Sequence, residues 1–188
     1  MSQRRVQIVI LCEDKQQEAF ARYFLKKRGF KDPVRAHICP EGSQAGEQYV
    51  RTHYPVQVKA YRANKDKVSI GLVVLIDADT GTLAARLNQL ASALEESEQK
   101  KPKNRKPNEA IAIFVPKRNI ETWIRYLQGE TVNEEAVYPK FKNNEAVCKT
   151  AAEDLADRCY SQSLPENAPP SLQAACGELQ RLLPLLQP

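Results

Sequence analysis

Two groups of acidic residues follow directly on apolar stretches of the chain, where carboxylates can bind a metal ion. Glu13 and Asp14 come after the first apolar stretch, and Asp77 and Asp79 come after a later one. The single residue between Asp77 and Asp79 puts both side chains on one face if the backbone stays extended. Mg²⁺ and Mn²⁺ prefer carboxylate oxygens together with substrate phosphates. We therefore predict metal-assisted phosphoryl transfer, with Mg²⁺ or Mn²⁺ bound by Glu13, Asp77 and Asp79 as the catalytic acids.

A simpler interpretation is that these acids are the solvated first residues of surface loops. For a single Asp-x-Asp pair, that interpretation is the commoner one. The presence of Glu13 after one expected strand and of Asp77 and Asp79 after another favours a site, because the carboxyl ends of parallel strands line one edge of a sheet.

The apolar stretches before the acids are typical of buried parallel strands, and amphipathic segments alternate with them. The expected strands cover residues 6–12, 34–39, 69–76 and 110–115. The expected helices cover residues 16–27, 47–53, 80–98 and 120–127. This alternation predicts an α/β layered domain with a mainly parallel central sheet flanked by helices.

Three segments between these elements are less regular. Residues 40–46 form an expected loop that lacks the Gly-Lys-Ser/Thr end of a phosphate-binding loop. Tyr54 and Pro55 predict a second loop, and residues 56–61 fit either a strand or a helix. The basic residues 100–107 form a linker that either follows a phosphate backbone or is simply solvated.

The last third of the chain has a helical pattern over residues 144–159 and 171–183, separated by a proline-rich segment. We expect an α/β domain over residues 1–128 and a helical extension over residues 129–188. The extension is expected to pack on the domain, so that the two form one structural unit.

The distribution of charge favours an anionic partner. The 188 residues carry a net charge of +5, and residues 1–118 hold 22 Lys and Arg against 13 Asp and Glu. Residues 119–188 hold 6 against 10. Nucleic acid is the commonest large anion, although a solvated surface explains the same charges equally well.

The cysteine content and the absence of long apolar runs predict a cytoplasmic protein. No apolar run is long enough for a membrane span, and no signal peptide is recognisable. Five cysteines and two histidines show no zinc-ligand spacing, so we expect reduced and mostly buried thiols. These residues are Cys12, Cys39, Cys148, Cys159, Cys176, His37 and His53.

Two short motifs resemble those of the TOPRIM superfamily. Residues 8–20, IVILCEDKQQEAF, resemble its first motif, and residues 71–82, GLVVLIDADTGT, resemble its Asp-x-Asp motif. TOPRIM domains occur in topoisomerases, primases, the OLD nucleases and ribosomal RNA maturases. The resemblance covers residues 6–120 and implies that Asp77 and Asp79 bind Mg²⁺, while Glu13 serves as a general acid/base or a group beside the metal.

The chain departs from the TOPRIM pattern at two positions. Asp14 stands where a glycine usually follows the glutamate, and Gln17 stands where an acid is often found. A side chain at position 14 restricts close backbone approach to a phosphate. Asp14 is therefore a candidate additional acid.

Residues 116–123, PKRNIETW, resemble an Arg-x-x-Glu-x-Trp stretch that follows a TOPRIM strand in OLD-like and small bacterial proteins. Lys117 and Arg118 are candidate phosphate contacts, and Glu121 is a candidate additional acid, because each lies just past the end of an expected strand. A lone tryptophan on a short amphipathic helix is more often a core residue than a base-stacking one, so we expect Trp123 in the core.

These observations favour a Mg²⁺-dependent nucleic-acid phosphoryl-transfer protein, most simply a small TOPRIM-type nuclease acting on DNA or RNA. The alternative is a non-catalytic TOPRIM-like module that binds nucleic acid or a partner protein in a bacterial defence or repair system, or that forms a homodimer. A third interpretation is a protein that binds or hydrolyses mononucleotides at the same acidic edge.

Overall fold

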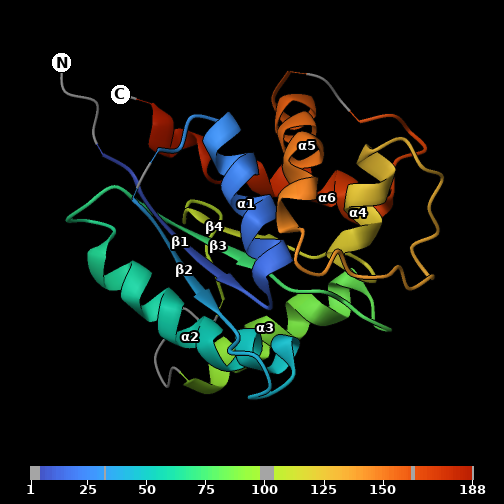
Figure 1. The fold of residues 1–188 in the computed structure, drawn as a ribbon. Helices are drawn as coiled ribbons and strands as arrows, with labels where there is room; N and C mark the ends of the chain where they lie inside the picture. Colours follow the sequence, from blue (N-terminus) through green and yellow to red (C-terminus); the bar gives the residue numbers. More distant parts are fainter. Residues whose placement is uncertain (1–4, 32, 98–103, 162–163, 188) are drawn as a thin grey trace.

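Four short parallel strands form the central sheet of the protein. The computed structural model describes residues 5–31, 33–97, 104–161 and 164–187. The strands are β1 (Gln7–Cys12), β2 (Val34–Ile38), β3 (Ile70–Leu75) and β4 (Ile111–Phe114). They lie in the order β2-β1-β3-β4, and every pairing is parallel (Figure 1). The predicted α/β fold class is therefore confirmed.

The position of each strand in the sheet agrees with its sequence. The central strands β1 and β3 are apolar almost throughout and mostly buried, as expected of strands that are covered on both faces. The edge strand β2 alternates between partly buried and exposed residues. Leu11 pairs with Val74, so β1 and β3 end close together at the carboxyl edge of the sheet.

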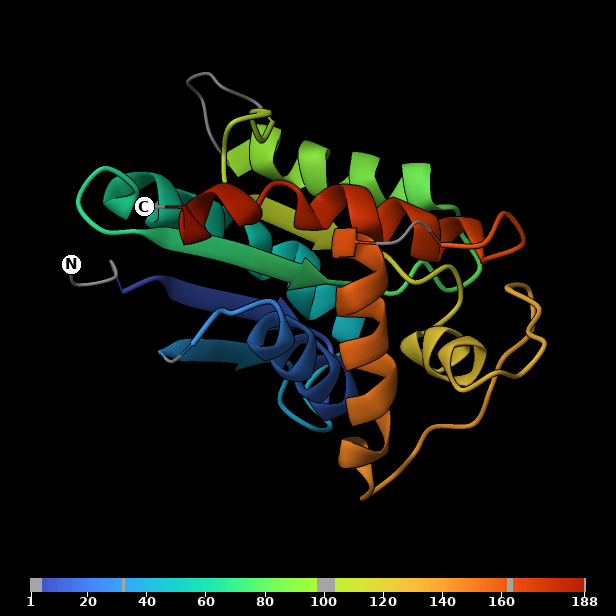
Figure 2. The ribbon, with the colours of Figure 1, turned by 90° about the horizontal axis from the view of Figure 1, so that it is seen from above.

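Helices cover both faces of the sheet. Figure 1 shows α2 and α3 on one face, and α1 and the C-terminal helices on the other. Figure 2 shows that the strand arrows point toward α4. The helices are α1 (Lys15–Lys27), α2 (Gly46–Asn64), α3 (Leu83–Ser97), α4 (Ile120–Leu127), α5 (Lys149–Ser161) and α6 (Pro170–Leu179). None of the described helices is both long and apolar enough to cross a bilayer.

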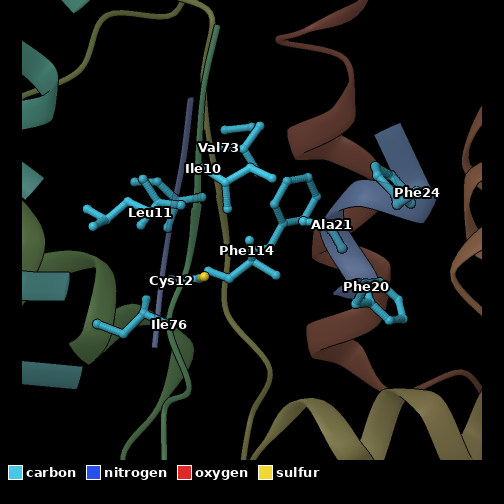
Figure 3. Close-up of a cluster of buried hydrophobic side chains, with 14 of the residues drawn as sticks. Ile10, Leu11, Cys12, Phe20, Ala21, Phe24, Val73, Ile76 and Phe114 are labelled. Atoms are coloured by element: carbon cyan, nitrogen blue, oxygen red, sulfur yellow. The ribbon is translucent and has the colours of Figure 1, made fainter. Parts of the chain in front are cut away.

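Part of the hydrophobic core lies between α1 and the sheet. Figure 3 shows Ile10, Val73 and Phe114 pointing from the strands toward α1. The rings of Phe24 and Phe114 meet edge to face, with centroids 5.7 Å apart. Phe24 lies on the buried face of α1, as the amphipathic pattern predicts. This packing fixes α1, and with it the acidic residues that precede the helix.

The C-terminal helices pack on the domain. Helix α5 runs against α1, and α6 lies against β4. The helix predicted over residues 144–159 is confirmed from Lys149 onward as α5, and its first turn is instead a 3-10 turn, η1 (Glu145–Cys148). The helix predicted over residues 171–183 is confirmed as α6 but ends at Leu179, before a second 3-10 turn, η2 (Leu183–Leu186). Pro184 in η2 cannot donate the backbone hydrogen bond of a continuing helix.

Two other predictions from the sequence are wrong. Helix α2 runs without interruption through Pro55, where we predicted a loop. A proline inside a helix costs about 3 kcal/mol, but Tyr54 and Val58 are fully buried on this helix, and their burial offsets that cost. Cys159 and Cys176 form a disulfide that joins α5 to α6, so the reduced-thiol prediction fails for this pair.

The disulfide was not predicted because folding brings together two cysteines 17 residues apart, with their Cα atoms 4.7 Å from each other. Cys12, Cys39 and Cys148 are free thiols. Of the predicted basic linker, residues 100–103 lie outside the described residues, as does Glu98 at the predicted end of α3.

Candidate active site

Glu13 and Asp77 meet at the carboxyl edge of the sheet. Each follows a central strand, and the parallel pairing of β1 with β3 brings the two strand ends together. The backbone N–H of Asp77 donates a hydrogen bond of 2.5 Å to Oε1 of Glu13. The structure therefore brings these two predicted acids into contact.

Gln17 connects the acids to one another. Its amide Nε2 donates to Oδ1 of Asp77 over 3.0 Å, and its Oε1 accepts from the backbone N–H of Glu13 over 2.9 Å. Its own backbone N–H donates to Oδ1 of Asp14, which caps the N-terminus of α1. Gln17 is fully buried. A residue that looked like a departure from the TOPRIM pattern is therefore the group that orients the acids.

Burial changes the acidity of this pair. Burial raises the pKa of Glu13 to about 7, and the neighbouring charges of Asp79 and Asp14 add to the increase. Burial also raises the pKa of Asp77 well above its usual range, followed by the charge of Glu13. The raised pKa values mean that the protonated carboxyl groups are favoured in the metal-free protein. A bound cation would instead favour the ionised carboxylates.

Asp79 does not join the pair in the way that the sequence predicted. Its backbone has a φ of +53°, so the chain turns at this residue and does not stay extended. Its Oδ2 accepts a hydrogen bond from Nη2 of Arg86 over 3.1 Å. Arg86 also bonds Glu47 on α2, with 3.0 Å between Nη1 and Oε2. Within the described part of the chain, no three acidic, histidine or cysteine side chains are grouped as a metal site.

The two predicted phosphate contacts differ in their availability. Lys117 forms an ion pair with Glu135, with 3.2 Å between Nζ and Oε1. Nη1 of Arg118 lies 3.4 Å from the carbonyl oxygen of Asp79.

Trp123 is buried and donates from Nε1 to Oγ of Ser171 over 2.8 Å, which confirms the core interpretation.

An open pocket of about 520 Å³ lies beside the acids. Glu13, Asp14 and Glu121 line it, together with Lys140. Nζ of Lys140 lies 3.0 Å from Oδ2 of Asp14. The sequence analysis missed Lys140, which is 126 residues from Asp14 and lies outside any regular pattern.

The start of α2 lies against Glu13. A Cβ atom at Gly46 would come within 2.7 Å of Cβ and 2.8 Å of Oε2 of Glu13, so the close approach requires glycine. Free backbone N–H groups in the first turn of a helix favour a nearby anion. The residue 40–46 loop, predicted as a turn without a phosphate-loop ending, thus brings a helix N-terminus to the acids.

Glu121 lies in the first turn of α4 and is 1% exposed. Burial raises its pKa, followed by the charge of Asp14. Its Oε1 is buried and has no hydrogen-bond partner among the described residues. Both additional acids predicted from the sequence, Asp14 and Glu121, therefore line the same pocket as Glu13.

A larger pocket, of about 740 Å³, lies between the end of α4 and residues 165–170. None of the predicted catalytic acids lines it. We place the candidate site at the 520 Å³ pocket because Glu13 and the buried Glu121 line it, although Asp77 and Asp79 do not.

Comparisons of the chain with protein-family models, curated proteins and solved structures found no match. The TOPRIM resemblance therefore rests on the short motifs around Glu13 and Asp77.

Proposed function

We propose that the protein is a Mg²⁺-dependent nucleic-acid phosphoryl-transfer protein, most simply a small TOPRIM-type nuclease. The supporting observation is the contact between Glu13 and Asp77, two acids with raised pKa values, of which Glu13 lines an open pocket. Two carboxylates placed together out of water are unfavourable unless a proton or a cation compensates them.

The donor atoms fit a hard divalent cation. Carboxylate oxygens of Glu13 and Asp77 would hold Mg²⁺, and Asp79 would join them after leaving Arg86. When bound, Mg²⁺ would supply positive charge to the phosphoryl oxygens and orient the displacement. Gln17 would keep the Asp77 carboxylate in place through its 3.0 Å hydrogen bond.

The chain's own groups provide the remaining functions. Glu13 would either bind the cation or, as the alternative role, accept a proton from an attacking water. Lys140 lies at the pocket and can hold the phosphate, and Arg118 lies near Asp79. Both Lys140 and Lys117 are ion-paired, but Lys117 is the weaker candidate because its side chain is 20% exposed, against 58% for Lys140.

A cleavage assay tests the proposal. Single- and double-stranded DNA and RNA oligonucleotides are incubated with the protein and Mg²⁺ or Mn²⁺. Asp77→Asn keeps the size of the side chain and should abolish cleavage. Glu41→Gln is the matched control, since Glu41 lines the same pocket with a side chain that is 91% exposed. Cleavage that persists in Asp77→Asn at the wild-type rate would contradict the proposal.

A non-catalytic nucleic-acid-binding module is the second candidate. The ion pair between Asp79 and Arg86 favours this candidate, because it occupies the carboxylate of a residue that was predicted to bind the metal. Binding that weakens steeply with salt, without cleavage of any substrate in the panel, would favour this candidate over the nuclease.

A further inference from the structure

Two buried oxygen atoms beside the pocket have no hydrogen-bond partner among the described residues. They are Oε1 of Gln16 and Oε1 of Glu121. The two side chains are 6% and 1% exposed. Buried polar atoms are nearly always paired, and the two residues that carry these orphan acceptors both line one pocket, so the two atoms are candidate ligands of a group bound there.

The helices hold both side chains at this pocket. Gln16 lies in the first turn of α1, and Glu121 lies in the first turn of α4. The two helices pack together through Phe20 and Trp123, whose ring centroids are 6.2 Å apart. Nε2 of Gln16 donates to the carbonyl oxygen of Glu145 over 3.0 Å, which fixes the amide beside the Cys148 thiol.

The charges around the orphan atoms indicate a cation as the ligand. An amide oxygen and a carboxylate oxygen both accept, so one ligand that satisfies both must be a cation or a donor. Asp14 and Glu13 line the same pocket and add further carboxylates. Three basic residues also line it: Lys140 pairs with Asp14, Lys15 pairs with Glu41, and Lys142 lies at the wall. None of these lysines donates a hydrogen bond to either orphan atom, although the charge of Lys140 acts on Glu121.

We propose that Asp14, Gln16 and Glu121 bind a divalent cation, Mg²⁺ or Mn²⁺, through their side-chain oxygens, beside the Glu13 and Asp77 pair. Hard divalent cations accept such a mixture of carboxylate and amide oxygens. The catalytic meaning of this site rests on the proposed function, because the cation would face a phosphate held in the same pocket. Binding of the cation does not depend on catalysis.

Titration of the full chain with Mn²⁺ tests the proposal. Bound ions are counted by calorimetry and by the loss of the electron paramagnetic resonance signal of free Mn²⁺. We expect Glu121→Gln to weaken one binding event at least about tenfold, because it removes a ligand charge. Gln16→Glu adds a charge at the same pocket and should tighten that event. Glu41→Gln should bind as the wild type does.

The variants separate this site from the site of the proposed function. Asp77→Asn should lose Mn²⁺ binding at the Glu13 and Asp77 pair but keep the Mn²⁺ binding that depends on Glu121. The double variant Asp77→Asn/Glu121→Gln should lose Mn²⁺ binding at both sites. Unchanged binding in Glu121→Gln, with circular dichroism matching that of the wild type, would overturn the inference while leaving the nuclease proposal intact. Weakened binding in Glu121→Gln, with no cleavage by the wild type, would support the inference and count against the nuclease. A wild type that binds no Mn²⁺ would also overturn it.

Discussion

The backbone N–H of Asp77 donates a hydrogen bond to Oε1 of Glu13 over 2.5 Å, and so joins the ends of the two central strands. Gln17 holds both residues from the first turn of α1. The acids at this edge are therefore positioned by backbone and amide groups of neighbouring elements, which makes their protonation a property of the folded state.

The stability of the metal-free protein should fall as the pH rises from about 4.5 to 7. Glu13 has a raised pKa in the folded protein, so over this range the unfolded chain has lost a proton that the folded one retains. The change from 4.5 to about 7 corresponds to roughly 3 kcal/mol. Urea unfolding in a chelator at several pH values measures it. Glu13→Gln should lose this part of the pH dependence; equal slopes in the two proteins would show that Glu13 does not titrate in this way.

Gln17→Glu should destabilise the metal-free protein at pH 8. The substitution replaces the amide that donates to Asp77 with a carboxylate, and two buried acids then face each other. We expect a loss of roughly 1–3 kcal/mol, recovered at pH 5 or by adding Mn²⁺. Thermal unfolding is the measurement. Gln48→Glu on the exposed side of α2 is the control and should change stability little.

Gly46→Ala should disturb both stability and metal binding. The new methyl group would come within 2.8 Å of Oε2 and closer still to Cβ of Glu13, so either Glu13 or the start of α2 must move. A loss of about 1–3 kcal/mol is typical of such crowding. Gly177→Ala in α6 is the matched control, because no atom lies within 4 Å of the added Cβ. Mn²⁺ affinity and thermal unfolding that are unchanged in Gly46→Ala would show that the contact is easily relieved.

Lys140→Gln should tighten Mn²⁺ binding and weaken nucleic-acid binding. The ammonium group lies 3.0 Å from Oδ2 of Asp14, where it repels a nearby cation and occupies a carboxylate. The same positive charge would attract a phosphate. Calorimetry with Mn²⁺ and fluorescence anisotropy with a labelled oligonucleotide measure the two effects. Lys142→Gln, which changes another lysine of the same pocket, serves as the comparison. Both affinities moving in the same direction would contradict the role given to Lys140.

Replacing the disulfide should destabilise the C-terminal helices. Cys159 and Cys176 connect α5 to α6 across 17 residues, and a loop of that length corresponds to about 3 kcal/mol. Cys159→Ser combined with Cys176→Ser should lower the melting temperature as much as a reducing agent lowers that of the wild type. The reducing agent should have no effect on the double variant. Cys39→Ser, at a free and half-buried thiol, should change little.

The sequence by itself determined the strands, the parallel α/β class and the position of the acids at strand ends. These features depend on local patterns: an apolar run such as residues 69–76 can only be a buried element, and Asp77 follows directly on it. Because parallel strands end at one edge, the sequence predicted that Glu13 and Asp77 could converge, and the pairing of β1 with β3 in the structure brings them into contact. The roles assigned to these acids, and to nucleic acid as partner, remain predictions.

Only the tertiary structure decided which groups surround the acids. Asp79 turns to Arg86, and Lys140 reaches Asp14 from 126 residues away. Neither contact leaves a periodic signal, because each joins side chains from separate elements whose relative positions depend on packing. The disulfide likewise depends on how α5 and α6 pack together. In α2, burial of the helix outweighs the low helix propensity of Pro55. Local patterns therefore place the elements, and packing between distant segments determines the chemistry at their ends.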